Sequence, residues 1–564
     1  MHHRIHPKNS LDGLWQFAFL GEEPYAGSEQ TAWTLALIPS AFDALPDHAG
    51  QRGRAVYQTS FFCPAGQTGV LRFEAVSMRA EIWVDGQNLA SHACGYAPFD
   101  VHVPPSTATE RELVVIVDNR FDFATCPMHE ECFDFYQYGG ILRSVSFRPL
   151  PTGPWVRSLR VLPTAGYRDG EVEVTVEVGN AEDASTLRVF SAGQELASIG
   201  LDAAGRFGPA IVRVPDPRVW SPQDPALHEL RVALVDRQGA ECDDAEVTFG
   251  LRRIETRDGR LWLNGERLVL KGYNRHEWHP NFGPCTPVAQ MLADLQLMRK
   301  LGCNFVRGSH YPQDQRFLDL CDRMGFLVWE ENLGWGQREK TFASELFRRH
   351  HAETLEAMVR ASWNHPSVIL WGFLNEAGTD QDYCGETIEE SVRLIRSLDA
   401  SRPITFASMF GMVDRHFDKV DVISINQYPG WYGCEGHPDP LSLVAPGIAA
   451  TVESIDRRGF RAKPIIVSEI GAEALYGWRD PHNDFFTEDY QAEYLRTACE
   501  AVLGNDRLSG IALWHFSDAR TYGGCRAMVR PRTFNNKGTF DEYRRPKAAA
   551  QAVSMVFHQS TSTS

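Results

Sequence analysis

A repeated strand-then-helix pattern begins near residue 255 and continues to the end of the chain, and it limits the possible fold more than any other feature. Short apolar runs indicate buried strands, and helical patterns fall between several of them. The predicted strands are 268–273, 305–310, 327–331, 368–376, 404–408, 422–426, 465–469 and 511–516. The clearest helical patterns cover 288–301, 343–363, 387–398, 489–503 and 546–557. Eight such units in about 300 residues predict a (β/α)8 TIM barrel, with the fifth and sixth units least clearly marked.

Two of the predicted strands end in a glutamate. One runs Trp371-Gly372-Phe373-Leu374-Asn375-Glu376, and the other runs Ile465-Ile466-Val467-Ser468-Glu469. The carboxyl ends of barrel strands meet at one face, where their side chains can form a site. A pair of carboxylates there is what cleavage of a glycosidic bond requires. A lone glutamate would more often be a solvated loop acid, but two on apolar strands favour catalysis.

Polar and aromatic side chains also follow most of the other predicted strands. These groups are 274–277, 309–311, 330–332, 426–428 and 514–516. None is diagnostic alone, because a buried histidine or tryptophan is more often packing than chemistry. Solvation does not readily explain their recurrence at nearly every carboxyl end, so the sequence predicts a site there.

The part of the chain before the barrel reads as two β domains. Residues 1–152 contain alternating runs such as Val70-Leu71-Arg72-Phe73-Glu74, separated by turn signals, which predicts a jelly-roll sandwich. A Pro-rich hinge at 151–154 leads into residues 153–253, where 170–177 alternates clearly, and we expect an immunoglobulin-like sandwich. The barrel would then occupy 254–564. An aromatic stretch containing Asp134 breaks the alternation of the first domain and suggests a loop directed elsewhere, although most such loops only cover a domain junction.

Composition excludes several classes of partner. The formal net charge of −17 argues against nucleic acid and anionic membranes, and an acidic substrate would need local cations. We find no apolar run of about 18 residues, so no membrane span is expected, and the start lacks the apolar core of a signal peptide. The twelve cysteines show no metal-ligand spacing, which predicts reduced thiols, no metal and a cytoplasmic location.

Over nearly its whole length the chain resembles glycoside hydrolase family 2, in the order jelly roll, immunoglobulin-like domain, barrel. The motifs that carry the resemblance are 271–277, 307–312, 371–376 and 468–473. Within the family the chain is similar to the β-glucuronidases through Asn426-Gln427-Tyr428-Pro429-Gly430-Trp431-Tyr432 and Asn535-Asn536-Lys537-Gly538. A galactosidase of this family would usually carry further β domains, and this chain stops after the barrel.

The resemblance implies a retaining exo-β-glycosidase that needs no cofactor and releases glucuronic acid through a covalent glycosyl-enzyme. It implies that Glu376 is the acid/base and Glu469 the nucleophile. Tyr428 would hydrogen-bond the nucleophile, Asn375 would donate to the sugar 2-hydroxyl, and Trp514 would lie beneath the ring. Asp134 and His310 match positions that contact sugar hydroxyls, so the first domain would complete the site. The positions implied to contact the sugar are Asp134, His310, Asn375, Asn426, Tyr428, Tyr432 and Trp514.

Asn535 and Lys537 bear on the class of sugar. They lie two residues apart, which in an extended segment places both side chains on one face. Spacing alone favours an ordinary surface lysine, whereas the resemblance implies that the pair binds the carboxylate of a uronic acid. The chain departs from the family in having Ala377 after Glu376 where glucuronidases commonly have proline. The short connection 331–342 should leave the aglycone side of the site accessible. Arg338 in this connection is a second candidate cation for the pocket, so glucuronide and galacturonide both stay possible as substrates.

The leading hypothesis is a β-glucuronidase that acts on small-molecule or oligosaccharide β-uronides. A β-galacturonidase or dual hexuronidase keeps the same mechanism, and a β-galactosidase is less expected. A catalytically inactive sugar-binding protein is the non-enzyme alternative, and retention of both Glu376 and Glu469 argues against it. Because large barrel enzymes of this kind are often oligomers, we also expect a homo-oligomer.

Overall fold

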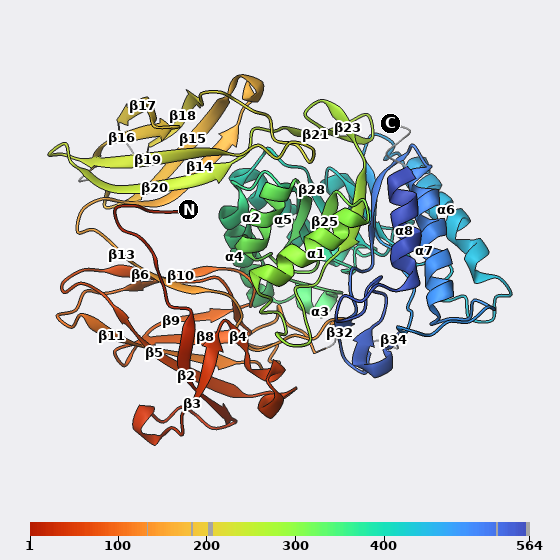
Figure 1. Cartoon of the computed structure of the whole chain (residues 1–564), viewed down its shortest axis with the longest axis horizontal. Helices are drawn as coiled ribbons and strands as arrows, with labels where there is room; N and C mark the ends of the chain where they lie inside the picture. The colour runs from red at the N-terminus through yellow and green to blue at the C-terminus, as the bar shows by residue number, and fades with distance from the viewer. Residues whose placement is uncertain (132, 182–183, 201–206, 526–527, 560–564) are drawn as a thin grey trace.

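The computed structural model describes the chain from residue 1 to 564 except residues 132, 182–183, 201–206, 526–527 and 560–564. It contains three domains in chain order, and these confirm the predicted fold class (Figure 1). The first β domain is drawn in red and orange, the second in yellow, and both lie against one side of the green-to-blue barrel.

The first domain is a β-sandwich. Its larger sheet has the order β3 (Thr34–Ile38), β2 (Gly13–Gly21), β5 (Arg54–Phe62), β11 (Glu110–Asp118), β8 (Arg79–Val84) and β9 (Gln87–Ala93). A four-stranded sheet contains β1 (Asn9–Ser10), β13 (Val145–Pro149), β6 (Gly69–Phe73) and β10 (Phe99–Val103). A short third sheet joins β4 (Ser40–Ala41), β12 (Gly140–Ile141) and β7 (Val76–Ser77). Alternate residues of β6 are buried, because one face of the sheet packs on the core and the other meets solvent.

The second domain is a smaller sandwich of two antiparallel sheets. One contains β14 (Trp155–Pro163), β15 (Glu171–Gly179) and β18 (Phe207–Arg213). The other has the order β17 (Gln194–Gly200), β16 (Ala184–Ser191), β19 (His228–Asp236) and β20 (Glu241–Phe249). The inward valines Val172, Val174 and Val176 of β15 belong to the same buried cluster as Leu230 and Val232 of β19, as an immunoglobulin-like core requires.

Eight parallel strands close the barrel, and each predicted strand overlaps one of them. In order they are β24 (Leu270–Asn274), β25 (Phe305–Gly308), β26 (Leu327–Glu331), β27 (Val368–Asn375), β28 (Ile404–Ser408), β29 (Ile423–Asn426), β30 (Ile465–Glu469) and β31 (Leu508–Leu513). Closure occurs where β24 pairs with β31. The strands are buried along their whole length, which explains why they appear in the sequence as continuous apolar runs rather than as alternation.

Helices cover the outside of the barrel. They are α1 (Val288–Lys300), α2 (Gln315–Met324), α4 (Glu345–Ser362), α5 (Gly385–Leu398), α6 (Val444–Arg457), α7 (Glu488–Leu503) and α8 (Ala548–Gln559), with a short α3 (Glu339–Phe342) before α4. The five clearest sequence patterns correspond to α1, α4, α5, α7 and α8. Residues 409–422, all described, contain a 3-10 turn at Phe417–Lys419 and no α-helix, so the weakly marked fifth unit has a loop in place of its helix.

The aromatic stretch of the first domain packs directly on the barrel. Phe133, Phe135 and Tyr138 belong to the same buried cluster as the barrel side chains. The indole of Trp278, after β24, donates to the Tyr138 hydroxyl at 2.7 Å. This contact holds the Asp134 loop at the carboxyl ends of the barrel strands. Within the described part of the chain, no helix has the length and apolarity to span a membrane, and the ten cysteines whose side chains the structure describes are free thiols.

Candidate active site

The two strand-end glutamates lie at the same face of the barrel. Glu469 is the last residue of β30 and is 3% exposed, and Glu376 directly follows β27 and is half-buried. Glu376 has a φ of 51°, in the left-handed region that non-glycine residues rarely adopt. Its backbone N–H donates to Ala407 at 2.9 Å, which fixes this strained position. Strain of this kind is concentrated at functional sites.

Glu469 is surrounded by donors that favour its ionised form. Arg307 Nη1 donates to Oε1 at 2.8 Å, and the Tyr428 hydroxyl donates to Oε2 at 2.8 Å. Arg307 is fully buried and also holds Glu331 through Nε and Nη2, at 2.9 and 2.8 Å. A guanidinium fixed at two carboxylates cannot rotate away, so its contact with Glu469 is preorganised.

The two glutamates compete for one proton. Burial raises the pKa of Glu376, and burial together with the Glu376 carboxylate raises the pKa of Glu469. Among the described residues Glu376 accepts one side-chain hydrogen bond, from Asn426 Nδ2 at 3.0 Å, whereas Glu469 accepts from a cation and a phenol. The negative charge is therefore better stabilised on Glu469 and the proton on Glu376, which is the division of roles that an acid and a nucleophile require.

Asn375 presents an amide donor for which the described residues offer no acceptor. Its Oδ1 accepts from Arg307 at 2.8 Å and from Asn426 at 3.0 Å, which fixes the orientation of the amide. Its Nδ2 is fully buried and has no hydrogen-bond partner among the described residues. A buried donor without an acceptor costs about 1–3 kcal/mol unless a ligand satisfies it. The orphan amide therefore marks the place where a ligand hydroxyl or carbonyl belongs.

His310 and Trp514 form one wall of the site. Their rings stack at 5.1 Å, and both are almost completely buried. Burial, assisted by the Arg307 charge, lowers the pKa of His310 well below its ordinary value, so the ring is neutral. Its Nδ1 lies 2.9 Å from Glu331 Oε1, and a proton on Nδ1 would leave Nε2 to accept from a sugar hydroxyl.

Asp134 reaches the barrel from the first domain and is bound there by Arg530. The guanidinium donates through Nε at 2.9 Å and through Nη2 at 2.6 Å, one bond to each carboxylate oxygen. Asn535 Nδ2 donates to the same carboxylate at 3.0 Å. The structure thus brings the predicted residues Asp134 and Asn535 together, through contacts within the chain that the sequence did not suggest.

Lys537 also has a protein carboxylate as its partner. Its ammonium donates to Glu473 Oε1 at 3.1 Å and to the Tyr432 hydroxyl at 2.7 Å, and it is 1% exposed. Glu473 Oε1 accepts from Arg530 Nη1 as well. Although burial alone would raise it, these two cations hold the pKa of Glu473 below its usual range. Two cations and two carboxylates therefore form one buried cluster: Asp134, Glu473, Arg530 and Lys537.

Sequence reasoning missed Arg530 and gave Glu473 no role. Both belong to irregular segments, in which no periodicity indicates the direction of a side chain. Glu473 lies in the motif 468–473 that carries the family resemblance, and its spacing from Glu469 was the one sequence signal that could have placed it in the site.

Arg338 lies beside Glu376. Its Nη1 donates to the Glu376 carbonyl at 2.7 Å and to the Gln337 carbonyl at 3.0 Å.

Comparison with known proteins places every domain in one family. The model for "Glycosyl hydrolases family 2, TIM barrel domain" matches residues 254–561, the sugar binding domain model matches 8–151, and a further model of the family matches 157–252. The chain is 27% identical to a beta-glucuronidase of Paenibacillus borealis, over 96% of this chain and 95% of the relative. It is 28% identical to the Homo sapiens beta-glucuronidase, over 96% and 89%. A solved beta-galacturonidase from Eisenbergiella tayi, bound to galacturonate, superposes with a TM-score of 0.90 at 32% identity, over 99% and 98%.

Proposed function

The chain belongs to glycoside hydrolase family 2, and from this membership we propose that it hydrolyses β-D-glucuronides to glucuronic acid and the aglycone, with retention at the anomeric carbon. The observation that carries the proposal is the Asn375 amide, whose buried Nδ2 has no described protein acceptor beside the pair Glu376 and Glu469. A hydrogen bond from this amide to the sugar 2-hydroxyl would strengthen as the oxocarbenium-like transition state forms.

The proposed reaction has two steps. Glu469 attacks the anomeric carbon while Glu376 protonates the glycosidic oxygen, so the bond to the aglycone breaks and a glycosyl ester forms. Glu376, now ionised, then takes a proton from a water molecule that attacks the same carbon, which releases glucuronic acid and frees Glu469. Arg307 and Tyr428 support the first step because their hydrogen bonds favour the ionised form of Glu469.

The uronate would be received by the cluster of Asp134, Glu473, Arg530 and Lys537. The four side chains have a formal charge of zero before substrate binds. The two carboxylates hold the two cations in place, and their negative charge does not exceed the positive charge of the cations. An ammonium has three donors, and Lys537 directs two of them at Glu473 and Tyr432. The third would bind the substrate carboxylate. This arrangement supports a uronide over a neutral glycoside.

A β-galacturonide is the second candidate substrate, and a hexuronidase that accepts both sugars would use the same residues. The similarity to the galacturonidase of Eisenbergiella tayi favours it, and so does Arg338 beside Glu376. Glucuronide and galacturonide differ only in the configuration at C4, so one well-placed donor can select between them.

A panel of 4-nitrophenyl β-glycosides tests the proposal. We expect the glucuronide to be hydrolysed at least a hundredfold faster than the galactoside, with retained configuration in the first product detected by NMR. Faster hydrolysis of the galacturonide would assign the enzyme to that sugar. Sugar binding without turnover of any glycoside would make the protein a sugar-binding module and would overturn the proposal.

We further propose a homo-oligomer in the cytoplasm. The free thiols of the described cysteines support a reducing compartment. Leu14, Leu35 and Leu37 of β2 and β3 are 61–68% exposed, and Leu14 lies opposite Leu37 across the two strands, which supports an interface between copies. Sedimentation equilibrium at micromolar concentration should give a mass at least twice that of one chain, and cell fractionation should place the activity in the cytoplasm.

A further inference from the structure

The loop that carries Asp134 is bound to the barrel at a second place, outside the cluster of charged side chains. The backbone N–H of Tyr136 donates to the Arg520 carbonyl at 2.9 Å, and that of Gln137 donates to the Tyr522 hydroxyl at 3.2 Å. Both acceptors belong to the chain that follows β31. Two successive backbone groups of the first domain therefore hold this loop against the barrel.

Arg52 of the first domain holds the same Tyr522 hydroxyl. Its Nη2 donates to that hydroxyl at 3.1 Å, and its Nη1 donates to the Gln137 carbonyl at 2.7 Å. The Nη1 atom also lies 3.6 Å from Oδ2 of the fully buried Asp43, and the guanidinium lies over the ring of Tyr136, 4.8 Å from its centroid. Because these contacts fix the guanidinium from several sides, the Tyr522 hydroxyl meets a charged donor that is already in place.

This contact is connected to both members of the pair Asp134 and Arg530. Thr521 is the residue before Tyr522, and its hydroxyl donates to Asp134 Oδ1 at 3.4 Å. The backbone N–H of Thr521 donates to the Thr533 carbonyl at 2.8 Å, and the N–H of Thr533 donates to the Arg530 carbonyl at 3.0 Å. A displacement of Tyr522 would therefore move the aspartate and the arginine relative to each other.

We propose that Tyr522 and Arg52 are positioning residues for the substrate carboxylate, because they fix Asp134 relative to Arg530 in the cluster that would receive it. Among the described residues, neither side chain hydrogen-bonds to either strand-end glutamate. Their loss should weaken binding of the uronate and leave cleavage of the glycosidic bond nearly unchanged. This inference rests on the proposed function and adds two residues on which recognition of a uronide depends.

The test compares a charged with a neutral sugar. The substrates are the 4-nitrophenyl β-uronide of whichever uronic acid the wild type hydrolyses and the matching β-glucoside. Tyr522→Phe removes only the hydroxyl, and it should raise KM for the uronide about tenfold, the order expected for one hydrogen bond to a charged donor. We expect little change in kcat on the uronide or in kcat/KM on the glucoside. Arg52→Gln should act in the same direction, and the double variant should lose little more than one single variant, because both act through one hydrogen bond.

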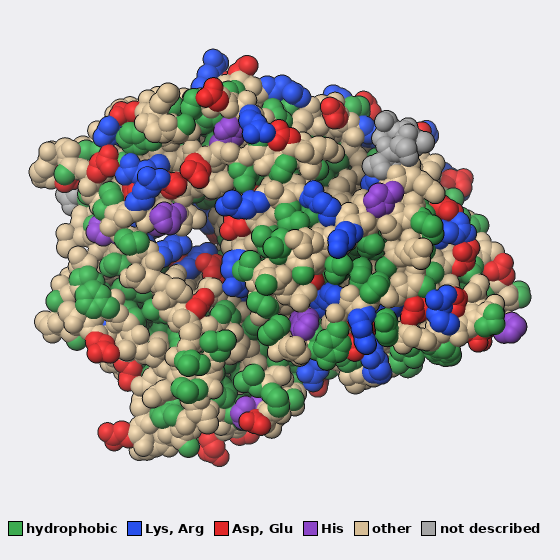
Figure 2. All heavy atoms as spheres, viewed as in Figure 1, with side chains coloured by type: hydrophobic (Ala, Val, Ile, Leu, Met, Phe, Trp, Pro, Cys, Tyr) green, Lys and Arg blue, Asp and Glu red, His purple; other side chains and the backbone are tan. Residues whose placement is uncertain are grey.

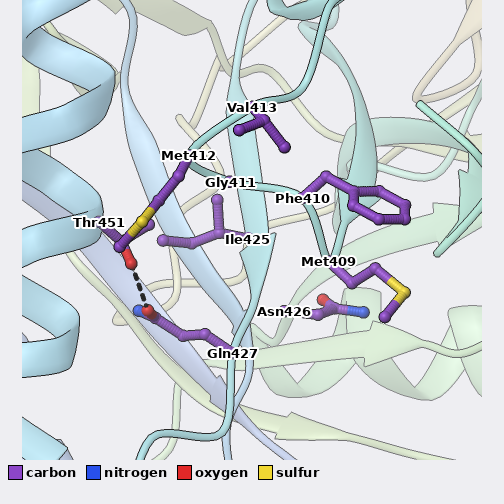
Figure 3. Close-up of a pocket in the computed structure, with 9 residues that line it drawn as sticks. All are labelled: Met409, Phe410, Gly411, Met412, Val413, Ile425, Asn426, Gln427 and Thr451. Carbon is purple, nitrogen blue, oxygen red and sulfur yellow. Dashed lines mark hydrogen bonds between the residues drawn. The ribbon is translucent and has the colours of Figure 1, made fainter. Parts of the chain in front are cut away.

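Thr451→Val is the matched control, because it also removes one hydroxyl near the site. The Thr451 hydroxyl, on α6, donates to Gln427 Oε1 at 3.0 Å, and Figure 3 shows this bond as a dashed line. Gln427 follows Asn426, which donates to Glu376, so the control lies beside the acid and away from the Asp134 loop. It should leave the ratio of uronide to glucoside turnover unchanged.

The outcomes separate this inference from the proposed function. If uronides are hydrolysed but Tyr522→Phe lowers kcat/KM equally on uronide and glucoside, or changes neither, the two residues do not position the carboxylate site. If the wild type hydrolyses no uronide, the proposed function fails, and chemical denaturation tests the positioning role instead. The losses in free energy of unfolding for Asp134→Ala and Tyr522→Phe should then be less than additive, because the phenol holds the aspartate in its ion pair. Additive losses would overturn the inference.

Discussion

Arg530 and Asp134 form a two-pronged ion pair between the barrel and the first domain. The pair is buried, with side-chain exposures of 3% and 10%, and each carboxylate oxygen receives its own donor. The residues are 396 positions apart in the chain. Because Arg530 also contacts Glu473, which holds Lys537, the position of the first domain is coupled to the cations expected to bind the substrate. The first domain is therefore part of the site rather than an appendage. Acidic and basic side chains are interspersed over the second domain and the barrel on the face shown in Figure 2.

Breaking this pair should cost both stability and activity. Asp134→Ala leaves the Arg530 guanidinium buried, with Glu473 as its remaining carboxylate partner among the described residues, and loss of one partner of a buried pair costs about 3–5 kcal/mol. We expect a lower Tm together with a fall in kcat/KM on the uronide of at least a hundredfold. Asp47→Ala, at an exposed aspartate of the same domain, is the control. Wild-type values for Asp134→Ala would show that the ion pair is dispensable.

The glutamate pair is tested by two amides. Glu469→Gln should abolish turnover, because no glycosyl ester can form. Glu376→Gln should reduce turnover of alkyl uronides by about 10²–10⁴, the usual contribution of general acid catalysis. The same variant should slow the first step on dinitrophenyl uronides much less. Burst kinetics separate that step from hydrolysis of the intermediate. If Glu376→Gln slowed glycosylation equally for both leaving groups, another residue would be the acid.

A buried acid outside the site predicts how stability varies with pH. Glu330 is fully buried on β26, its Oε2 has no partner among the described residues, and burial raises its pKa from 4.5 to about 7. The folded state therefore binds more protons than the unfolded state between those values, so this group's contribution to stability is present below pH 4.5 and is lost as pH rises to about 7. Glu330→Gln should stabilise the protein by on the order of 2 kcal/mol at pH 8 and little at pH 4.5. Chemical denaturation at both pH values measures this.

Glu390→Gln supplies the control for that experiment, since Glu390 is an exposed residue of α5. Its effect on the free energy of unfolding should be small and similar at both pH values. An equal effect of Glu330→Gln at pH 4.5 and pH 8 would mean that Glu330 is not protonated in the folded protein.

The sequence predicted the barrel well because its strands are buried on both faces. Such strands appear as short apolar runs with a polar end, and this rule located β27 and β30 together with their glutamates. The same rule gives no information on the loop that joins β28 to β29 or on the segment after β31, where side-chain direction depends on tertiary contacts. The partners of Arg530 lie in the first domain and after β30, so no local pattern could have indicated them.

Arg338 can be tested as a selector of the sugar. Its hydrogen bond to the Glu376 carbonyl places its guanidinium beside the site, where a charged hydrogen bond to a substrate oxygen would contribute about 1.5–3 kcal/mol. Arg338→Ala should change the ratio of galacturonide to glucuronide turnover by about tenfold or more. Arg349→Ala, at a guanidinium that is 65% exposed on α4, should leave the ratio unchanged. Equal losses on both sugars would assign Arg338 to holding the backbone of Glu376.

Lys537 offers a test of the class of substrate. Removing one partner of a desolvated charge pair costs about 2–5 kcal/mol, or roughly thirty- to several-thousand-fold, so Lys537→Ala should lower kcat/KM on the uronide by that order. The variant leaves Glu473 bound to Arg530, and the cluster then carries a net negative charge that repels the uronate. A β-glucoside has no carboxylate, so its slow hydrolysis should stay level or improve. The wild-type preference for the uronide should weaken in high salt, but less than a surface contact would, because the ammonium is 1% exposed. Equal losses on uronide and glucoside would mean that Lys537 supports the fold through Glu473 and Tyr432, and the proposed uronidase activity would lose its main cation.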